Sequence, residues 1–529
     1  MTLVTLILVP ILFGVILYKA PIKVGKGIVL VVQGYLSLAS VLLLKQNMEE
    51  GTFYQVLGGD NAILYNTLRG DRISLIFVCL SVFLFTMAFL YAVRVEEYFN
   101  KKFLLLFLVL QGTLNGIFIT DDIFNLFVLI EVSTVLATVL IMFKREGRNA
   151  FDGVFYIVMQ IVTMMFFLFG IAYIYRTFGV LNFTEMARLM ELGVPRETLL
   201  LPFAFLMTGI ALKIGFFPLF SWVTHAYGNQ SAPFPVLAIL SGLFVKSSLF
   251  FVIRMHGMFY PTLDFRTFFI ALGLVTGVVG AVKALAQKDI KLMLAFSTIS
   301  QIGLITMGIF DGGVTAYYGA VFHIINHALF KSLLFFTAGI IVREYKTSHV
   351  NEISGVFKRM PAVGFATLIG ILGITGFPFI NGSMSKYWIM AEASPMMEMA
   401  MWAVNAGTIL VFVKYGMMLL GTSPVKVKTE PVKTGVVVFM GLVCIGVGIF
   451  AANIMTVLFD VNLSIDWTSF GLKGLIYGAL VLAAHGVYRW ALSKTELLYR
   501  IAKSPSTVQQ SCFILLAFFV SMVLYGMIF

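Results

Sequence analysis

The sequence from Leu201 to Arg254 reads LPFAFLMTGIALKIGFFPLFSWVTHAYGNQSAPFPVLAILSGLFVKSSLFFVIR. It contains two apolar segments, each long enough to span a bilayer, joined by a short polar turn. Each segment carries one lysine near its middle, Lys213 in the first and Lys246 in the second. A charged amine at the centre of a bilayer costs about 2.5–3.5 kcal/mol on insertion scales. Two such lysines in adjacent helices therefore indicate a polar path inside a membrane protein.

The composition of the whole chain is typical of a membrane protein. Of its 529 residues, 60% are hydrophobic and 12% are charged, whereas about a quarter of the residues of soluble proteins are charged. Apolar segments of spanning length lie roughly at 2–18, 28–44, 73–92, 103–118, 123–143, 153–175, 200–222, 234–253, 267–285, 292–310, 314–342, 362–391, 399–420, 434–458, 471–488 and 511–529. We therefore expect an all-α integral membrane protein with about 14–16 transmembrane helices.

The basic residues are concentrated in alternate loops. One set of loops holds 23 lysines and arginines and the other set holds 8. Because the excess marks cytoplasmic loops, we expect the loop at 343–359 in the cytoplasm and the loop at 45–72 outside. Both termini are then outside, in a multi-pass protein of the cell (plasma) membrane. The net charge of +12 lies mostly in these loops and does not indicate a nucleic-acid partner.

Further titratable side chains fall within the apolar segments. The full set at membrane depth is Glu131, Lys213, Lys246, His323, His327, Lys331, Lys386 and Lys414. The segment HIINHALFK places two histidines and a lysine at i, i+4 and i+8, on one stripe of one helix. Such a stripe must face protein or water, because contact with lipid would be very costly.

Structural roles stay open for some of these residues. Lys414 lies nearest a helix end, where a lysine can snorkel towards the interface. Glu131 can be a fixed partner of a lysine, and His323 can be a hydrogen-bonded packing residue. Asp121 and Asp122 begin a helix, where carboxylates favour the helix dipole, so capping is their expected role.

Helix breakers accompany two of the lysines. Pro218 follows Lys213, and Gly376, Pro378 and Gly382 precede Lys386. Interruptions at corresponding places in two halves indicate a repeat with its site at the membrane midplane, and the tripeptide Phe-Val-Lys at 244–246 recurs at 412–414. We expect two inverted five-helix repeats containing broken helices. The expected division of the chain is 1–100 as an N-terminal flank, 101–255 and 256–420 as the repeats, and 421–529 as C-terminal membrane helices.

The sequence contains no pattern for a redox cofactor, a metal or a nucleotide. Its three cysteines, Cys79, Cys444 and Cys512, are far apart in sequence, and no CxxC, Cys/His cluster, GxGxxG or P-loop is present. We expect no cofactor, no metal site and no active site of its own. Whether the chain is part of an enzyme depends on the assembly that it joins.

Several motifs resemble one family, the proton-conducting antiporter-like subunits. They are DIFNLFVLIE, which ends at Glu131; KIGFFPLFSWVTHAYGNQSAPFPVLAILSGLFVK, from Lys213 to Lys246; QKDIKLMLAFSTISQIG at 287–303; NHALFKSLLFFTAG at 326–339; and GVFKRMP followed by GFPFINGSMSK, which ends at Lys386. The family includes the large subunits of Mrp-type sodium/proton antiporters, related subunits of membrane-bound hydrogenase-type complexes, and those of respiratory complex I. The 57–59 and 71–74 segments are more similar to the Mrp and hydrogenase branches.

The resemblance implies a subunit of a multisubunit respiratory or Mrp-type complex. Protons would pass through the Glu/Lys/His residues above, with exchange for sodium left open. A carboxylate that approaches or leaves a buried lysine changes how tightly the lysine holds its proton, and histidine suits a relay near neutral pH. The implied partners are other membrane subunits, further antiporter-like subunits among them, and the bilayer; a peripheral redox module is left open. The alternatives are a complex I subunit proper, a non-conducting scaffold and a carrier for an organic solute.

Overall fold

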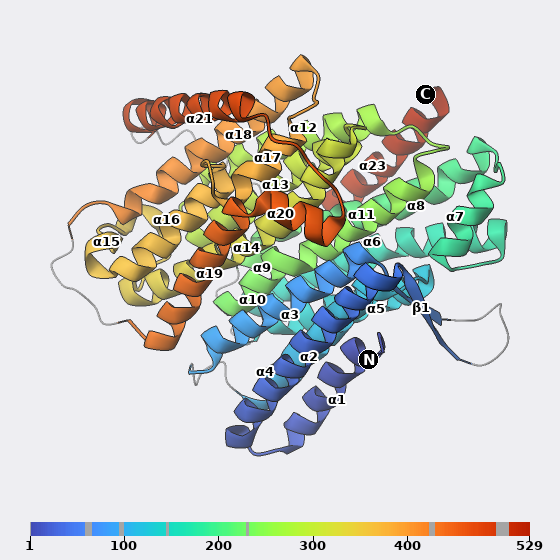
Figure 1. Cartoon of the computed structure of the whole chain (residues 1–529), viewed down its shortest axis with the longest axis horizontal. Helices are drawn as coiled ribbons and strands as arrows, with labels where there is room; N and C mark the ends of the chain where they lie inside the picture. Colours follow the sequence, from blue (N-terminus) through green and yellow to red (C-terminus); the bar gives the residue numbers. More distant parts are fainter. Residues whose placement is uncertain are drawn as a thin grey trace. The chain divides into compact units, whose positions relative to one another are not determined.

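The computed structural model describes residues 2–58, 66–94, 100–143, 148–228, 232–422, 429–492 and 507–529. The helices form two compact units, coloured along the chain in Figure 1. Unit 1 comprises Met1–Ile214, Asn229–Phe265 and Thr507–Phe529, and unit 2 comprises Gly215–Gly228 and Arg266–Ser506. Gly59 of the 57–59 segment lies outside the described residues, and so do seven of the 23 basic loop residues counted above: Lys144, Arg145, Lys426, Lys428, Lys494, Arg500 and Lys503.

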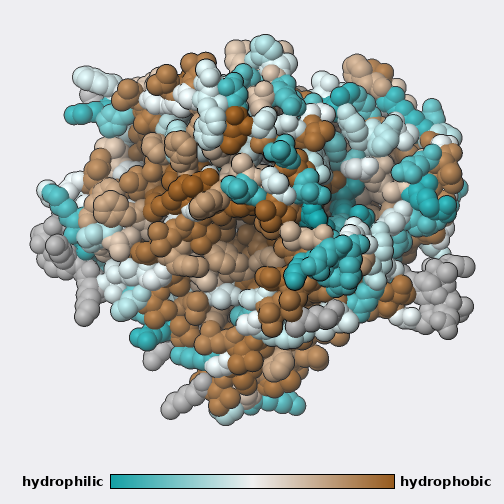
Figure 2. Space-filling model, viewed as in Figure 1, coloured by the Kyte–Doolittle hydropathy of each residue, from teal (hydrophilic) through white to brown (hydrophobic). Residues whose placement is uncertain are grey.

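The described chain is a multi-pass membrane protein. Fourteen of its helices are long and apolar enough to cross a membrane, and two shorter apolar helices, Thr5–Lys19 and Pro361–Thr375, accompany them. This confirms the expected all-α class and the expected 14–16 spans. Hydrophobic side chains cover broad areas of the face in Figure 2. In the helix Trp467–Val487, for example, Leu475 and Leu482 are 73% and 77% exposed, as suits a helix surface in contact with lipid.

Unit 1 is built from helices and one short hairpin. Its elements are α1 (Thr5–Lys19), α2 (Ile22–Glu50), β1 (Phe53–Leu57), β2 (Asn66–Gly70), α3 (Arg72–Ala92), α4 (Lys101–Ile119), α5 (Ile123–Ile141), α6 (Arg148–Phe178), α7 (Phe183–Glu191), α8 (Arg196–Ile214), α10 (Phe234–Ile239), η1 (Leu240–Phe244), α11 (Val245–Phe259) and α23 (Val508–Ile528). Helix α1 packs on α4, where a Cβ on Gly112 would lie 2.7 Å from the Ile7 carbonyl oxygen. The glycine therefore sets the close approach of these helices.

The hairpin was not predicted from the sequence. Strands β1 and β2 are antiparallel, with Phe53 opposite Gly70 and Leu57 opposite Asn66. The Phe53 ring occupies the space that a side chain at Gly70 would need. Directly after β2, Asp71 caps α3 by accepting a hydrogen bond from the backbone nitrogen of Ser74 at 2.8 Å. The hairpin therefore delivers a carboxylate to the start of a transmembrane helix.

Helix α23 completes unit 1 although it is far along the chain from the rest. It packs on α8 and α6. Arg196 donates to the Gly526 carbonyl at 3.0 Å, and the rings of Phe205 and Phe519 lie 4.5 Å apart. A Cβ on Gly526 would lie 2.1 Å from a methyl carbon of Leu200. Only glycine fits this contact.

Unit 2 contains the remaining elements. They are α9 (Trp222–Gly228), α12 (Arg266–Ala286), α13 (Ile290–Phe310), α14 (Val314–Tyr345), η2 (Val350–Glu352), α15 (Val356–Arg359), α16 (Pro361–Thr375), α17 (Asn381–Ile389), α18 (Pro395–Gly416), η3 (Met417–Leu419), α19 (Pro431–Ile449), α20 (Ala451–Ile454), η4 (Met455–Phe459), α21 (Trp467–Val487) and η5 (Tyr488–Leu492). Helices α12 and α13 meet through small residues, since a Cβ on Gly303 would lie 2.3 Å from the Gly273 carbonyl oxygen.

Both predicted helix breaks are present. Helix α8 ends at Ile214, before Gly215 with φ +86°, and α16 ends at Thr375, before Gly376 with φ +88°. Positive φ favours glycine, which pays no Cβ penalty there. A proline follows each glycine within three residues. The inverted relation between the repeats and the four-part division of the chain stay predictions.

Candidate functional site

All eight titratable residues predicted at membrane depth lie on helices of the two units. Glu131, Lys213 and Lys246 belong to unit 1, on α5, α8 and α11; His323, His327 and Lys331 on α14, Lys386 on α17 and Lys414 on α18 belong to unit 2. The five lysines and two histidines are buried, none more than 3% exposed. These seven side chains are therefore buried, and the hydrogen bonds of each indicate which chemical role it can have.

Lys213 is brought together with the helix that carries Glu131. Its amine donates to the Thr134 hydroxyl at 2.5 Å and lies 5.1 Å from the centre of the Phe244 ring. Thr134 is three residues after Glu131, on the same face of α5, and Glu131 interacts electrostatically with Lys213. Among the described residues, the Oε1 atom of Glu131 has no hydrogen-bond partner although it is buried. The pair can therefore form or loosen its contact without breaking another bond of that oxygen.

Lys246 lies just after an irregular turn. The π-helical segment η1, Leu240–Phe244, interrupts the helix from Phe234 to Phe259, and the Lys246 amine donates to the carbonyl of Ser241. A π-turn widens the helix and changes which carbonyls face side chains, and such turns are frequent at functional sites. The local irregularity therefore gives a fully buried amine a neutral oxygen acceptor.

His323 is held between two polar side chains. Its Nε2 atom lies 3.0 Å from the Gln301 side-chain oxygen, and Gln301 in turn donates to Thr408 at 2.9 Å. The Nδ1 atom lies 2.8 Å from the Ser385 hydroxyl. Because a hydroxyl can donate or accept, this environment suits both the neutral and the protonated imidazole.

The other two residues of the α14 stripe continue from His323. The rings of His323 and His327 have centroids 6.4 Å apart. Lys331, one turn further, donates to the Leu294 carbonyl at 2.7 Å and to the Ser297 hydroxyl at 2.5 Å. The predicted stripe therefore faces protein and not lipid.

Lys386, on α17, forms one hydrogen bond to α16, on the other side of the helix break, and one to α18. Its amine donates to the Ile374 carbonyl, near the end of α16, and to the Asn405 side-chain oxygen, each at 2.6 Å. A Cβ on Gly376 would lie 3.2 Å from the Lys386 side chain. The last turn of α16 therefore provides a carbonyl for this lysine, and Gly376 leaves the space for its side chain.

Lys414 bonds to the end of another helix. It donates to the carbonyls of Leu285 at 2.7 Å and Gln287 at 2.6 Å, where α12 ends. Basic side chains stabilise helix C-termini through their free carbonyls and the dipole. This geometry favours a structural contribution for Lys414, whatever part it has in a proton path.

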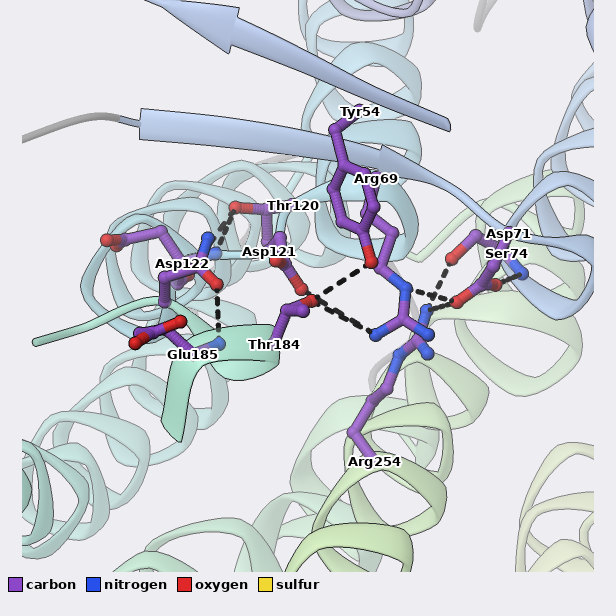
Figure 3. A network of polar contacts seen from close by, with 11 residues as sticks. Tyr54, Arg69, Asp71, Ser74, Thr120, Asp121, Asp122, Thr184, Glu185 and Arg254 are labelled. Atoms are coloured by element: carbon purple, nitrogen blue, oxygen red, sulfur yellow. Dashed lines mark hydrogen bonds and ion pairs between the residues drawn. The ribbon is translucent and has the colours of Figure 1, made fainter. Parts of the chain in front are cut away.

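A second cluster of polar residues in unit 1 is held together by ion pairs (Figure 3). This cluster was not predicted from the sequence. We call Arg69, Asp71 and Arg254 the charge cluster: Asp71 Oδ2 lies 2.5 Å from an Arg254 nitrogen and 2.9 Å from Arg69 Nε. Arg254 also donates to the Ser74 hydroxyl at 2.7 Å. Burial opposes ionisation of Asp71, but the two guanidinium groups and the Ser74 backbone N–H outweigh it and hold the pKa of this carboxyl below its usual range.

The two aspartates expected to cap α5 differ in role. Asp122 is the N-cap, because its carboxylate accepts from the Asn125 backbone nitrogen at 2.6 Å. Asp121 does not cap the helix; it lies 3.8 Å from Arg69 beside the charge cluster (Figure 3). Burial raises the pKa of the Asp121 carboxyl, although Thr184 and Arg69 act in the opposite direction. The prediction of capping is therefore right for Asp122 and wrong for Asp121.

One partly buried basic residue was overlooked in the sequence. Lys473 lies in the apolar span Trp467–Ala491, and its amine contacts Glu398 at 3.1 Å. The same signal that marked the other lysines, a charge inside an apolar segment, was present here. Within the described residues, no group of three or more His, Cys, Asp or Glu side chains is placed to hold a metal ion.

Comparisons with known proteins agree with this architecture. Residues 120–413, more than half of the chain, match the family described as NADH:quinone oxidoreductase/Mrp antiporter, TM. NADH-quinone oxidoreductase subunit N of Desulforudis audaxviator is 33% identical over 296 residues, which cover 55% of this chain and 58% of that protein. The chain thus matches less than two thirds of that relative's length.

Two solved structures show the same fold over most of the chain. A chain of the membrane-bound sulfane sulfur reductase, an archaeal respiratory membrane complex, superposes with a TM-score of 0.80 at 24% identity, covering 90% of this chain and 99% of that one. A chain of the Mrp complex from Dietzia sp. superposes with a TM-score of 0.77 at 18% identity, with the same coverage.

Proposed function

This chain belongs to the NADH:quinone oxidoreductase/Mrp antiporter family, and on that premise we propose that it translocates protons as an antiporter-like subunit of a multisubunit membrane complex. The proposed path uses Glu131, Lys213, Lys246, His323, His327, Lys331, Lys386 and Lys414. The observation that carries the proposal is the bonding of the buried lysines, which we define as Lys213, Lys246, Lys331, Lys386 and Lys414. Each of them donates to a neutral hydroxyl, amide or carbonyl oxygen.

Neutral acceptors suit a group that changes its charge. An ammonium group has three N–H donors and a neutral amine has two. Lys331, Lys386 and Lys414 each donate to two oxygens, so both bonds survive when the third proton leaves. At these fully buried sites a fixed carboxylate partner would oppose that change, since separating a buried ion pair leaves an uncompensated charge.

Glu131 is the acidic residue of the path, and its role is to change how tightly Lys213 holds a proton. Its electrostatic interaction with Lys213 strengthens the hold of Lys213 on a proton when the carboxylate is near, and weakens it when the carboxylate withdraws. The histidines of α14 carry protons between lysines, since imidazole titrates near neutral pH. Water fills the gaps in the path.

The driving force comes from partner subunits. The Mrp complex and the sulfane sulfur reductase are multisubunit membrane complexes in which similar chains occur, and we propose the same setting here, in a cell membrane with both termini outside. A redox module, or exchange of the proton for sodium, would then couple through neighbouring subunits.

The test replaces Lys386 by arginine. Arginine keeps the charge and the donors but stays protonated at any working pH, so proton flux should fall by about a hundredfold, as expected when a positioned proton-transfer group is lost. Lys386→Glu should retain more flux, because a buried carboxyl can also cycle protons. Flux is measured in proteoliposomes that contain the whole complex, with a potassium diffusion potential as the driving force and a pH-sensitive dye as the readout.

Assembly is measured on the same samples by subunit content and thermal denaturation. Wild-type flux in assembled Lys386→Arg complexes would contradict the relay. If substitutions of Lys213 and Lys246 also left flux unchanged, the chain would be a scaffold. Adding sodium on one side distinguishes proton flux alone from exchange, since only exchange makes proton movement depend on the sodium gradient.

A further inference from the structure

Beside Lys386, unit 2 contains a small cavity with a second basic residue on its wall. The cavity has a volume of about 30 Å³, and its lining includes Lys386, Asn405, Lys473, Gly474 and Tyr477. A water molecule needs about 10–15 Å³ measured in this way. The space therefore accommodates water next to Lys386 and is too small for an organic solute.

The Lys386 amine has one position left for such a water. Two of its donors are used by Ile374 and Asn405, and the residue lines the cavity. The third N–H of an ammonium, or the lone pair of an amine, is the position at which a proton is lost or gained. The cavity thus adjoins a lysine whose amine has a position for a water molecule.

Lys473 connects the cavity with a partly exposed carboxylate. Its amine donates to the Met390 carbonyl at 3.0 Å and lies 3.1 Å from Glu398 Oε1. The side chain of Lys473 is 13% exposed and that of Glu398 is 34% exposed. Glu398 lies in the first turn of α18, which the loop charges predict to be at the outer surface. Exposure therefore increases from Lys386 through Lys473 to Glu398.

We propose that Lys473 and Glu398 are the proton-release pair that follows Lys386. This inference rests on the proposed function and adds the step after Lys386. Lys473 gives one proton to the Glu398 carboxylate, and its neutral amine then takes a proton from the cavity water, which is replenished from the Lys386 ammonium. Lys386 ends neutral, Lys473 ends protonated, and the Glu398 carboxylic acid releases its proton to bulk water. The number of protons and the net charge are conserved until that release.

The first experiment replaces Glu398 by glutamine. The amide oxygen can still accept a hydrogen bond from Lys473 but cannot take up a proton. We expect driven proton flux in proteoliposomes of the whole complex to fall by about a hundredfold, with unchanged subunit content and melting temperature. Glu398→Asp should recover a substantial part of the flux. Glu392→Gln is the matched control, because Glu392 accepts a hydrogen bond from the Thr315 hydroxyl at 2.7 Å, whereas Glu398 is the carboxylate at Lys473.

A second experiment fills the cavity without changing a charge. Gly474→Leu places a side chain in the lining, where a Cβ would meet only Pro378 at 3.4 Å. Gly478→Leu is the control on the next turn of α21, with no atom within 4 Å of its Cβ position. We expect loss of flux in the first variant and wild-type flux in the second.

The outcomes separate this inference from the proposed function. If Lys386→Arg abolishes flux while Glu398→Gln and Gly474→Leu leave it at the wild-type rate, the release pair is wrong and the relay stands. If Lys386→Arg conducts normally, the proposed function itself fails. Loss of flux in Glu392→Gln equal to that in Glu398→Gln would also overturn the release pair, since a carboxylate that is not the Lys473 partner would then matter as much.

Discussion

The charge cluster and the buried lysines are two different ways to place charge inside one membrane protein. In the charge cluster, Asp71 is shared by two guanidinium groups at 2.5 and 2.9 Å. The buried lysines instead donate to hydroxyl, amide and carbonyl oxygens. Arginine cannot lose its proton, whereas lysine can. The difference teaches that permanent charges paired with each other hold helices in place, and that titratable amines on neutral acceptors are suited to moving protons.

The largest effect is expected where a matched charge is removed. Arg254→Leu leaves Asp71 buried with half of its compensation, so the free energy of unfolding should fall by about 3–5 kcal/mol. Thermal denaturation of the detergent-solubilised complex measures the loss. Flux per assembled complex should stay near the wild-type value. A stable variant with lost flux would assign the charge cluster to the proton path and break the comparison.

The opposite pattern is expected for a buried lysine. Lys246→Met removes an amine whose acceptor is the neutral Ser241 carbonyl, so no opposite charge is stranded. Proton flux should fall by about a hundredfold, while the melting temperature changes far less than in Arg254→Leu. A severe loss of stability with normal flux in the surviving complexes would show that Lys246 is structural.

A smaller effect should follow from a change of geometry that leaves every charge in place. Gly376→Ala puts a Cβ at φ +88° and 3.2 Å from the Lys386 side chain. We expect a loss of stability of about 1–2 kcal/mol from the left-handed backbone, together with reduced flux because the amine is displaced. Gly435→Ala, on a helix with open space at that position, is the control. Equal effects in both variants would show that the substitution acts through helix propensity alone.

The smallest effect concerns the pH dependence of the charge cluster. The pKa of Asp71 is lowered in the folded protein, so its ionised form stabilises the fold above the ordinary aspartate pKa of about 3.9. This contribution is lost as pH falls through the folded-state value. The stability difference between wild type and Asp71→Asn should thus be constant near neutrality and shrink below about pH 4. Denaturation curves at several pH values would show it, and a difference that grows on acidification would contradict the assignment.

The sequence predicted those features that depend on one residue in an apolar context. Charges within spans located Lys213, Lys246, Lys331 and Lys386, because the cost of burying an amine in lipid is local information. Both helix breaks were also located from local information, because glycine and proline interrupt a helix at the position where they occur. The roles of these residues in transport stay predictions.

Features that depend on contacts between distant segments were missed. Counting charges by loop assigns Arg254 to the outer face, because nothing near it in sequence indicates Asp71 as its partner. The hairpin lacks the alternating pattern of a buried strand, since residues Phe53–Leu57 alternate only between half-buried and exposed positions. Lys473 was missed for another reason. It lies close to the start of its span, where the presence of a lysine does not by itself indicate a functional site.

The late position of α23 has a consequence for biosynthesis. Unit 1 receives this helix only after the ribosome has translated all of unit 2, since Val508–Ile528 follows Ser506 in the chain. Until then, the surface of α8 around Leu200, into which Gly526 later fits, is uncovered in the membrane. Lipid chains, which are as apolar as leucine, can occupy that surface throughout synthesis. A translational arrest just before Thr507 should therefore trap a chain whose first unit remains open, however long its second unit has had to fold.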